Sequence, residues 1–252
     1  MKSEGASFLL AVQFLTRFPV KTTRLYTPER MAKAVRYYPL VGALVGAASA
    51  IAFVLASLAL PSAVAIIIAI AVGVLITGAF HEDGLADTFD GLGGGLSREQ
   101  ALRIMKDSRL GTYGTLALII ALGLKAATLI AMPTAVIPMA FVMAHGLSRL
   151  SSVCVIATSR YVREDGKAKP VADAASRTSL LIALATGAAL IALWCVWLPP
   201  IALIWGGAGL LAGHFAIRFM FERKLGGYTG DTLGAVQQAS EIGFYLGLLA
   251  WL

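Results

Sequence analysis

Charged residues are scarce in this sequence. Asp, Glu, Lys and Arg make up 14% of the 252 residues, whereas about a quarter of a typical soluble domain is charged. Hydrophobic residues account for 58%, and the mean hydropathy is +0.79. These values argue against an ordinary soluble domain and indicate an integral membrane protein.

Cysteine is almost absent too, which removes two classes of site. Cys154 and Cys195 both lie in apolar segments, so neither CxxC metal spacing nor a disulfide framework is present. The apolar run near the N-terminus is not predicted to be a signal peptide, because it is short, contains Gln13 and Arg17, and lacks a small-x-small cleavage site. We expect it to form an amphipathic or re-entrant helix at the membrane.

Long apolar segments fill most of the chain and predict an all-α, polytopic membrane helix bundle. A span needs about 20 apolar residues. About seven segments meet this length, approximately 37–60, 62–80, 113–131, 134–157, 179–198, 200–221 and 234–252. Uncharged junctions with proline at 60–62, 132–134 and 198–200 indicate tight turns between helical hairpins. Because the polar connections are short, we expect a single integral-membrane domain over residues 1–252.

The positions of the basic residues predict the orientation of these spans. Nineteen of the 21 Lys and Arg residues lie before the first span, or in or beside the connections after the second, fourth and sixth, which share one side. By the positive-inside rule this side is cytoplasmic. We therefore expect a multi-pass inner-membrane protein with a cytoplasmic N-terminus and an external C-terminus. The same loops explain the net charge of +7, and no basic stripe interleaved with aromatics predicts a nucleic-acid partner.

An acidic motif follows the second apolar segment. Residues 81–91 read HEDGLADTFDG, and a helix through them places Asp83, Asp87 and Asp90 on one face, because their spacing is i, i+4, i+7. Three carboxylates so close oppose one another's ionisation, so we expect a bound cation. Hard oxygen ligands favour Mg²⁺, with Mn²⁺ as the alternative. His81 projects to the opposite side, which argues against zinc.

Glycine-rich and polar segments on the same predicted side extend this candidate site. Glycines at 91 and 93–95 would let a phosphate approach backbone N–H groups closely. Asp107 is a fourth candidate metal ligand, and the cations beside it can hold a pyrophosphate. Before the last span, Asp231 is a candidate ligand, base or N-cap in a loop that can close over a substrate. The predicted substrate-binding residues are Lys106, Ser108, Arg109, Arg149, Tyr228, Thr229 and Asp231.

Ionisable residues within the apolar spans need a reason to be there. Among them are Lys125, His145, Arg149 and His214. We expect Arg149 to line the site because it is near the cytoplasmic end of its span, whereas Lys125 either snorkels or pairs internally. Acids, bases and a metal together predict phosphoryl-transfer chemistry, in which catalysis is mostly positioning and charge neutralisation.

The chain resembles the cobalamin synthase family of adenosylcobinamide-GDP ribazoletransferases over essentially its whole length. The resemblance rests on four blocks in order, at residues 13–20, 81–91, 104–114 and 226–235. It implies a Mg²⁺-dependent enzyme that joins adenosylcobinamide-GDP to α-ribazole or its 5′-phosphate and releases GMP. Association with other enzymes of the corrinoid pathway is implied by the resemblance only. Membrane lipid would surround the spans, and the sequence leaves the oligomeric state open.

On this resemblance, we expect the ribazole 3′-hydroxyl to displace GMP at the phosphorus joined to the cobinamide arm. Lys106 and Arg109 would neutralise charge on the departing GMP. One of the aspartates of the cluster, or Asp231, would accept the hydroxyl proton, and a coupled set of carboxylates does not allow the base to be assigned from sequence. The expected catalytic residues and metal ligands are Asp83, Asp87, Asp90 and Asp107.

Two other functions fit parts of the pattern. CDP-alcohol phosphotransferases are membrane enzymes with an aspartate-rich DxxDGxxAR motif, and residues 83–86 echo its centre. Asp87 stands where that motif has arginine, so the likeness is one of mechanism rather than of fold. A cation transporter would also use intramembrane charges, but the acids here cluster at one surface instead of along a midplane path.

Overall fold

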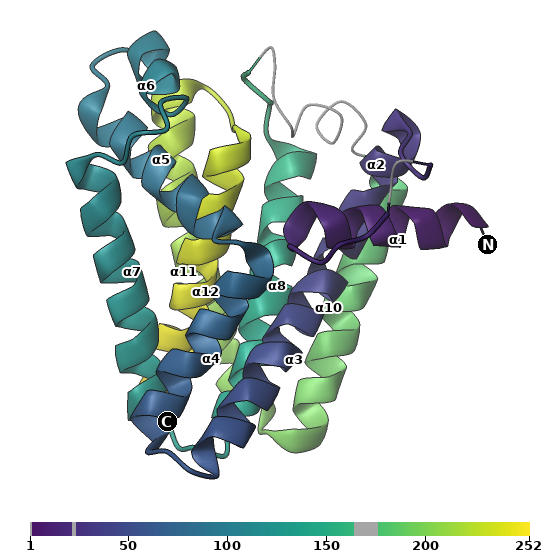
Figure 1. The fold of residues 1–252 in the computed structure, drawn as a ribbon, viewed down its shortest axis with the longest axis vertical. Helices are drawn as coiled ribbons and strands as arrows, with labels where there is room; N and C mark the ends of the chain where they lie inside the picture. The colour runs from purple at the N-terminus through teal and green to yellow at the C-terminus, as the bar shows by residue number, and fades with distance from the viewer. Residues whose placement is uncertain (1, 22–23, 164–175) are drawn as a thin grey trace.

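The computed structural model describes residues 2–21, 24–163 and 176–252. Within these ranges the chain is helical apart from turns, loops and an isolated bridge between Tyr161 and Tyr228, which confirms the predicted all-α class. Figure 1 shows the long helices packed into one bundle, with α1 lying across them. The elements are α1 (Lys2–Leu15), α2 (Pro28–Ala34), the 3-10 helix η1 (Val35–Tyr37), α3 (Tyr38–Ser57), α4 (Ser62–Thr77), α5 (Phe80–Gly94), α6 (Arg98–Ile104), α7 (Thr112–Ala131), α8 (Ile137–Thr158), α10 (Arg177–Trp197), α11 (Pro200–Leu225) and α12 (Gly230–Trp251).

Five stretches in the described residues are long and apolar enough to cross a membrane. They are Pro28–Ser57, which ends with α3, and the helices α7, α8, α10 and α11. α4 and α5 meet the same criterion only as a bent pair, which would add a sixth span. α12 has 22 residues but is less apolar, because it carries buried polar side chains such as Gln237, Gln238 and Glu241. The membrane bundle is therefore confirmed, and the predicted number of about seven spans is close to that in the structure.

The two ends of the bundle differ in character. Figure 1 shows the connections α3–α4, α7–α8 and α10–α11 at the lower end, together with the C-terminus. These are the tight, proline-containing junctions predicted from the sequence. α6 and the connection between α11 and α12 lie at the upper end, and α1 and α2 lie toward it. The polar segments singled out in the sequence therefore share one end of the molecule.

The chain bends by 86° between α4 and α5, so the helix in the apolar segment predicted at about 62–80 ends at Thr77 and the acidic motif lies on a separate helix. Gly78 and Ala79 adopt left-handed conformations, with φ of 65° and 57°. The backbone N–H of Arg17 donates to the carbonyl of Ile76 at 2.7 Å, and the Arg17 side chain lies where a Cβ on Gly78 would be. A left-handed alanine costs roughly 1–2 kcal/mol, and the N-terminal segment helps to hold this bend.

After the bend, α5 packs directly on the first turns of α12. A methyl group added to Gly84 would lie 2.7 Å from the carbonyl oxygen of Asp231, and one added to Gly234 would lie 3.0 Å from that of His81. Two helix backbones approach this closely only where small residues stand at the crossing. The crossing therefore fixes the acidic helix α5 beside the N-terminus of α12.

Candidate active site

The three aspartates of α5 lie on one continuous helix, as the sequence predicts. Their exposure falls along the helix, since Asp83 is exposed, Asp87 is half-buried and Asp90 is buried. The three carboxylates therefore have different surroundings, and the structure gives each of them different partners.

Asp83 and Asp87 share their surroundings with Asp231, which lies in the first turn of α12. The charges of Asp231 and Asp83 both act on Asp87, and that of Asp83 also acts on Asp231. Arg163 supplies the opposite charge. Its Nη2 atom lies 2.7 Å from Asp231 Oδ2 and donates to the carbonyl oxygen of Met105 at 3.4 Å. The structure thus brings together two predicted ligands, a predicted base and a cation that the sequence analysis did not assign to the site.

Asp90 has a structural role at the start of α7. Its two carboxylate oxygens accept the backbone N–H groups of Gly111 and Gly114, each at 2.8 Å. The free N–H groups and the dipole of a helix N-terminus both favour an anion at this place. The role of Asp90 as a metal ligand stays a prediction, and it would have to use the lone pairs that these two bonds leave.

Asp107 lies in the turn after α6 and is held by Arg109. The Arg109 guanidinium donates to both carboxylate oxygens, with Nη2 at 2.6 Å from Oδ2, and these hydrogen bonds lower the pKa of Asp107 to about 2. Arg163 contacts both Met105 in the same turn and Asp231. The turn therefore lies next to the acid cluster, defined as Asp83, Asp87 and Asp231. The predicted substrate contacts of this turn are all exposed, and they are Lys106, Ser108 and Arg109.

The glycines at the end of α5 serve packing, and the expected phosphate cradle is not formed there. α5 continues to Gly94, so the backbone of the glycine run up to this residue is helical. A Cβ on Gly91 would collide with Met105, and one on Gly93 would lie 2.6 Å from the ring of Tyr113. The glycines therefore let the α6–α7 region pack closely against α5.

The residues before α12 are engaged in structural contacts. Thr229 is the N-cap of α12 and forms a capping box, so the interpretation of Asp231 as the N-cap is wrong. Tyr228 is buried; its backbone N–H donates to the carbonyl of Arg160 at 2.8 Å, and its ring packs edge-on against Tyr161. Contact of Tyr228 and Thr229 with substrate stays a prediction. These contacts fix the start of α12, and with it the position of Asp231.

A cavity of ≈ 970 Å³ lies beside the acid cluster. It is lined by residues of α1, α3, α5, α8 and α12, and its lining includes Asp83, Asp231 and Arg163. Small-molecule sites are clefts of about 300–1,000 Å³. Charged groups of both signs therefore face a space of the size that a substrate needs.

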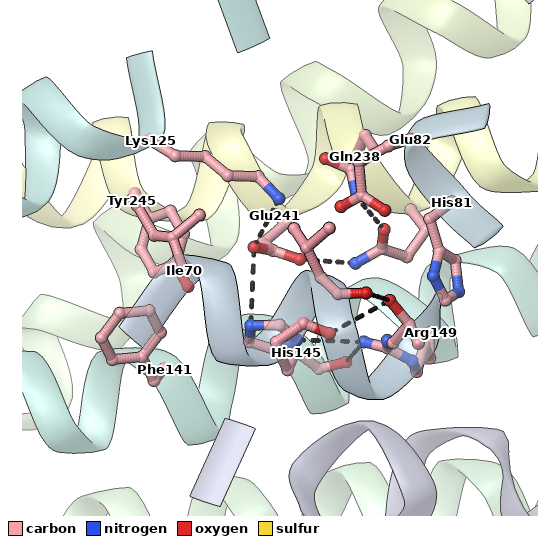
Figure 2. Close-up of a pocket in the computed structure, with 14 residues that line it drawn as sticks. Ile70, His81, Glu82, Lys125, Phe141, His145, Arg149, Gln238, Glu241 and Tyr245 are labelled. Atoms are coloured by element: carbon pink, nitrogen blue, oxygen red, sulfur yellow. Dashed lines mark hydrogen bonds and ion pairs between the residues drawn. The ribbon is translucent and has the colours of Figure 1, made fainter. Parts of the chain in front are cut away.

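A second group of polar residues is buried inside the bundle (Figure 2). Lys125 Nζ lies 2.8 Å from Glu241 Oε1, and Arg149 Nη1 donates to the carbonyl oxygen of His145 at 3.0 Å. Figure 2 shows these side chains around a small cavity, which has a volume of ≈ 20 Å³. A space of this size can hold about one water molecule. Of the two interpretations of Lys125, internal pairing is the one that the structure supports.

The buried group adjoins the large cavity. Thr77, His81 and Arg149 line both cavities, so the network forms part of the wall behind the candidate site. Gln238 links α12 to the acidic helix, because its amide donates to Glu82 Oε1 at 2.9 Å. Contact of Arg149 with a substrate stays a prediction. Its position between the two cavities would allow it to reach a substrate in the larger one.

Glu241, which contacts Lys125 and Gln237 in this network, was not predicted as a functional residue from the sequence. An acid within an apolar segment is itself a signal, and Glu241 could have been paired with Lys125 on that basis. His214, which the sequence does single out, belongs to a separate buried set on α8, α11 and α12. Its Nδ1 atom lies 2.7 Å from Ser151 Oγ, which lies 2.8 Å from Ser240 Oγ.

The described part of the chain contains no group of three or more His, Cys, Asp or Glu side chains placed to hold a metal ion. An ion at Asp83, Asp87 and Asp231 would therefore take some of its ligands from elsewhere. Mg²⁺ commonly binds one or two carboxylates together with substrate phosphates. The residues present fit a site that is shared with a substrate, and they do not form a closed protein cage.

Comparison with known proteins gives a consistent result over the whole chain. The family model for cobalamin-5-phosphate synthase matches residues 7–249. An adenosylcobinamide-GDP ribazoletransferase of Shewanella baltica is 46% identical over 247 residues, which cover 96% of this chain and 93% of the relative. One of Leptothrix cholodnii is 46% identical over 256 residues, which cover 98% and 96%. No solved structure matches.

The buried ion pair can be tested by a double-mutant cycle. Lys125→Met leaves the buried Glu241 carboxylate without its nearest cation, and breaking a buried pair in this way costs about 3–5 kcal/mol. We expect a lower thermal midpoint in detergent for Lys125→Met, and partial recovery when Glu241→Gln is added. If the decreases in thermal midpoint of the two single variants simply add in the double variant, the two side chains do not interact.

Proposed function

The chain belongs to the cobalamin-5-phosphate synthase family, and we propose that the acids at the crossing of α5 and α12 form its active site. The activity is that of an adenosylcobinamide-GDP ribazoletransferase. The enzyme transfers the adenosylcobinamide phosphate group to α-ribazole or α-ribazole 5′-phosphate and releases GMP. The observation that carries the assignment of the site is the presence of Asp83, Asp231 and Arg163 in the lining of one cavity of ≈ 970 Å³.

The reaction is the attack of an alcohol on a pyrophosphate. The 3′-oxygen of the ribazole forms a bond to the phosphorus that carries the cobinamide arm. The bond from that phosphorus to the bridging oxygen breaks, and GMP leaves with the electron pair. The hydroxyl proton passes to a carboxylate of the cluster, for which Asp83, Asp87 and Asp231 are the candidates. Asp83 and Asp231 line the cavity, and the charges of both act on Asp87, which supports this role.

Cationic side chains would hold the pyrophosphate. Arg163 and Arg149 both line the cavity, and a guanidinium group can bind two phosphate oxygens at once. Lys106 and Arg109 lie on the exposed turn next to Arg163, where they would neutralise charge on the departing GMP. Catalysis of this kind depends mainly on such positioning and neutralisation.

We propose Mg²⁺ as the metal, with Mn²⁺ as a substitute. One or two of Asp83, Asp87 and Asp231 would hold it together with the substrate, because they offer hard oxygen ligands and their charges act on one another. Asp90 and Asp107 are already engaged by two backbone N–H groups and by Arg109. When bound together with the pyrophosphate, the ion would neutralise charge on its oxygens.

We also propose that the acid cluster faces the cytoplasm. Support comes from the basic residues, 19 of 21 of which lie in the segments on that side or at their borders. Leu96, between α5 and α6, is 90% exposed. A cysteine at this position, in a variant without Cys154 and Cys195, should react with a membrane-impermeant maleimide in inverted vesicles only. Labelling in intact spheroplasts would contradict this orientation.

GMP release from adenosylcobinamide-GDP and α-ribazole tests the site directly. Asp87→Asn keeps the size of the side chain and removes its charge. We expect it to lower kcat by about 100-fold or more, the usual cost of losing one preorganised electrostatic contact, and EDTA to abolish release by the wild type.

Glu99→Gln is the matched control, since Glu99 is an exposed acid on α6 outside the cluster. It should release GMP at the wild-type rate. An equal loss of activity in Asp87→Asn and Glu99→Gln, or full activity of Asp87→Asn, would contradict a role of the acid cluster in the mechanism. Absence of release by well-folded wild type with Mg²⁺ would contradict the activity itself.

A further inference from the structure

A row of aromatic rings forms one wall of the large cavity. Phe14 of α1 stacks on Tyr38 of α3, with ring centroids 5.9 Å apart and planes at 8°. Phe14 also meets Phe80 of α5 edge-on at 5.4 Å, and Phe80 meets His81 at 5.4 Å. All four residues line the cavity, together with Asp83. The aromatic wall, defined as Phe14, Tyr38, Phe80 and His81, therefore leads to the first acid of the cluster.

Two of the four rings of this wall are not fully covered by protein. Phe14 is half-buried and Phe80 is 36% exposed, although both line a cavity. Aromatic faces that remain uncovered in a cavity can stack on a planar ligand, which gives substantial affinity with little conformational cost. The wall thus has free stacking surface that the packing of the helices does not use.

One polar atom in the wall also lacks a partner. Tyr38 is 5% exposed, and its hydroxyl has no hydrogen-bond partner in the described part of the chain. A buried hydroxyl without a partner is destabilising, so a ligand that supplies one would offset this cost. The lining near α1 and α3 also includes the apolar side chains of Leu10 and Met31 and the polar ones of Gln13, Thr16 and Arg17. The Thr16 hydroxyl already donates to the carbonyl of Val12 at 2.6 Å.

We propose that the aromatic wall binds the planar heteroaromatic base of the acceptor nucleoside, so that the attached ribose reaches toward Asp83. This inference rests on the proposed function and assigns one end of the same cavity. A benzimidazole-like base has few polar edge atoms, which suits a wall of aromatic rings with the free hydroxyl of Tyr38. The guanine of the donor has several hydrogen-bond donors and acceptors at its edge, so it needs more polar partners than the aromatic wall itself supplies.

Steady-state kinetics with each substrate varied in turn tests the assignment. Phe14→Leu keeps an apolar side chain but removes the stacking face, and we expect it to raise KM for α-ribazole about tenfold and to leave KM for adenosylcobinamide-GDP unchanged. Phe8→Leu is the matched control. Phe8 is on the same helix but meets Tyr37 and is not part of the cavity lining, so it should leave both constants unchanged.

Tyr38→Phe separates binding from folding. Removal of an unpartnered hydroxyl should not lower the thermal midpoint, but it should raise KM for α-ribazole several-fold. A rise in KM for adenosylcobinamide-GDP instead would place part of the donor at the wall and overturn the proposal, as would unchanged KM values for both substrates in both variants.

Equilibrium dialysis of α-ribazole alone keeps this test independent of turnover. Weaker binding to Phe14→Leu than to wild type supports the aromatic wall as the binding surface even if no GMP is released. In that case the proposed reaction is contradicted and the proposed binding site is not. Equal binding to wild type, Phe14→Leu and Phe8→Leu would overturn the wall as the base-binding surface.

Discussion

The backbones of α5 and α12 meet at Gly84 and Gly234 with no side chain between them, and the arrangement of the candidate site depends on that contact. It sets the aspartates of α5 beside Asp231 and within reach of Arg163. A larger residue at Gly84 would push apart the two elements that carry the acids. The cluster is therefore a property of a helix crossing, and a single helix with three acids in register would not create it.

The surroundings of the cluster follow from the cost of charge in an apolar bundle. Buried charges are tolerated when they are paired and hydrogen-bonded, and Lys125 and Glu241 pair at 2.8 Å. This requirement also explains why α12 is too polar to resemble a lipid-spanning segment, although it is as long as one. Its polar side chains face other helices, and its partners on α5, α7 and α8 supply the opposite charges and hydrogen bonds.

Hydropathy alone predicted most of the fold. The apolar segments and the uncharged proline junctions depend only on local sequence, so helices α3, α7, α8, α10 and α11 lie close to where they are expected. The bend at Gly78 and Ala79 could not be predicted from the local sequence, because it depends on contacts with Arg17 from a distant segment. A glycine run has several uses, and only tertiary structure distinguishes close packing from phosphate binding.

For the candidate site, the sequence predicted which acids share a helix face but not which groups surround each of them. The register of Asp83, Asp87 and Asp90 follows from helical spacing, but their separate partners do not. Arg163 and Glu241 were missed because each owes its role to a residue on another helix.

The most direct test is Mn²⁺ electron paramagnetic resonance on the purified protein in detergent, with and without the donor adenosylcobinamide-GDP. A control with the donor and no protein measures the Mn²⁺ that the donor binds by itself. A site shared with the substrate predicts little Mn²⁺ binding to the protein alone, because few protein carboxylates converge there. Saturable binding should appear when the donor is added, and it should be lost in Asp87→Asn. Binding that is equally tight without the donor, or that persists in Asp87→Asn, would contradict an acid cluster completed by the substrate's pyrophosphate.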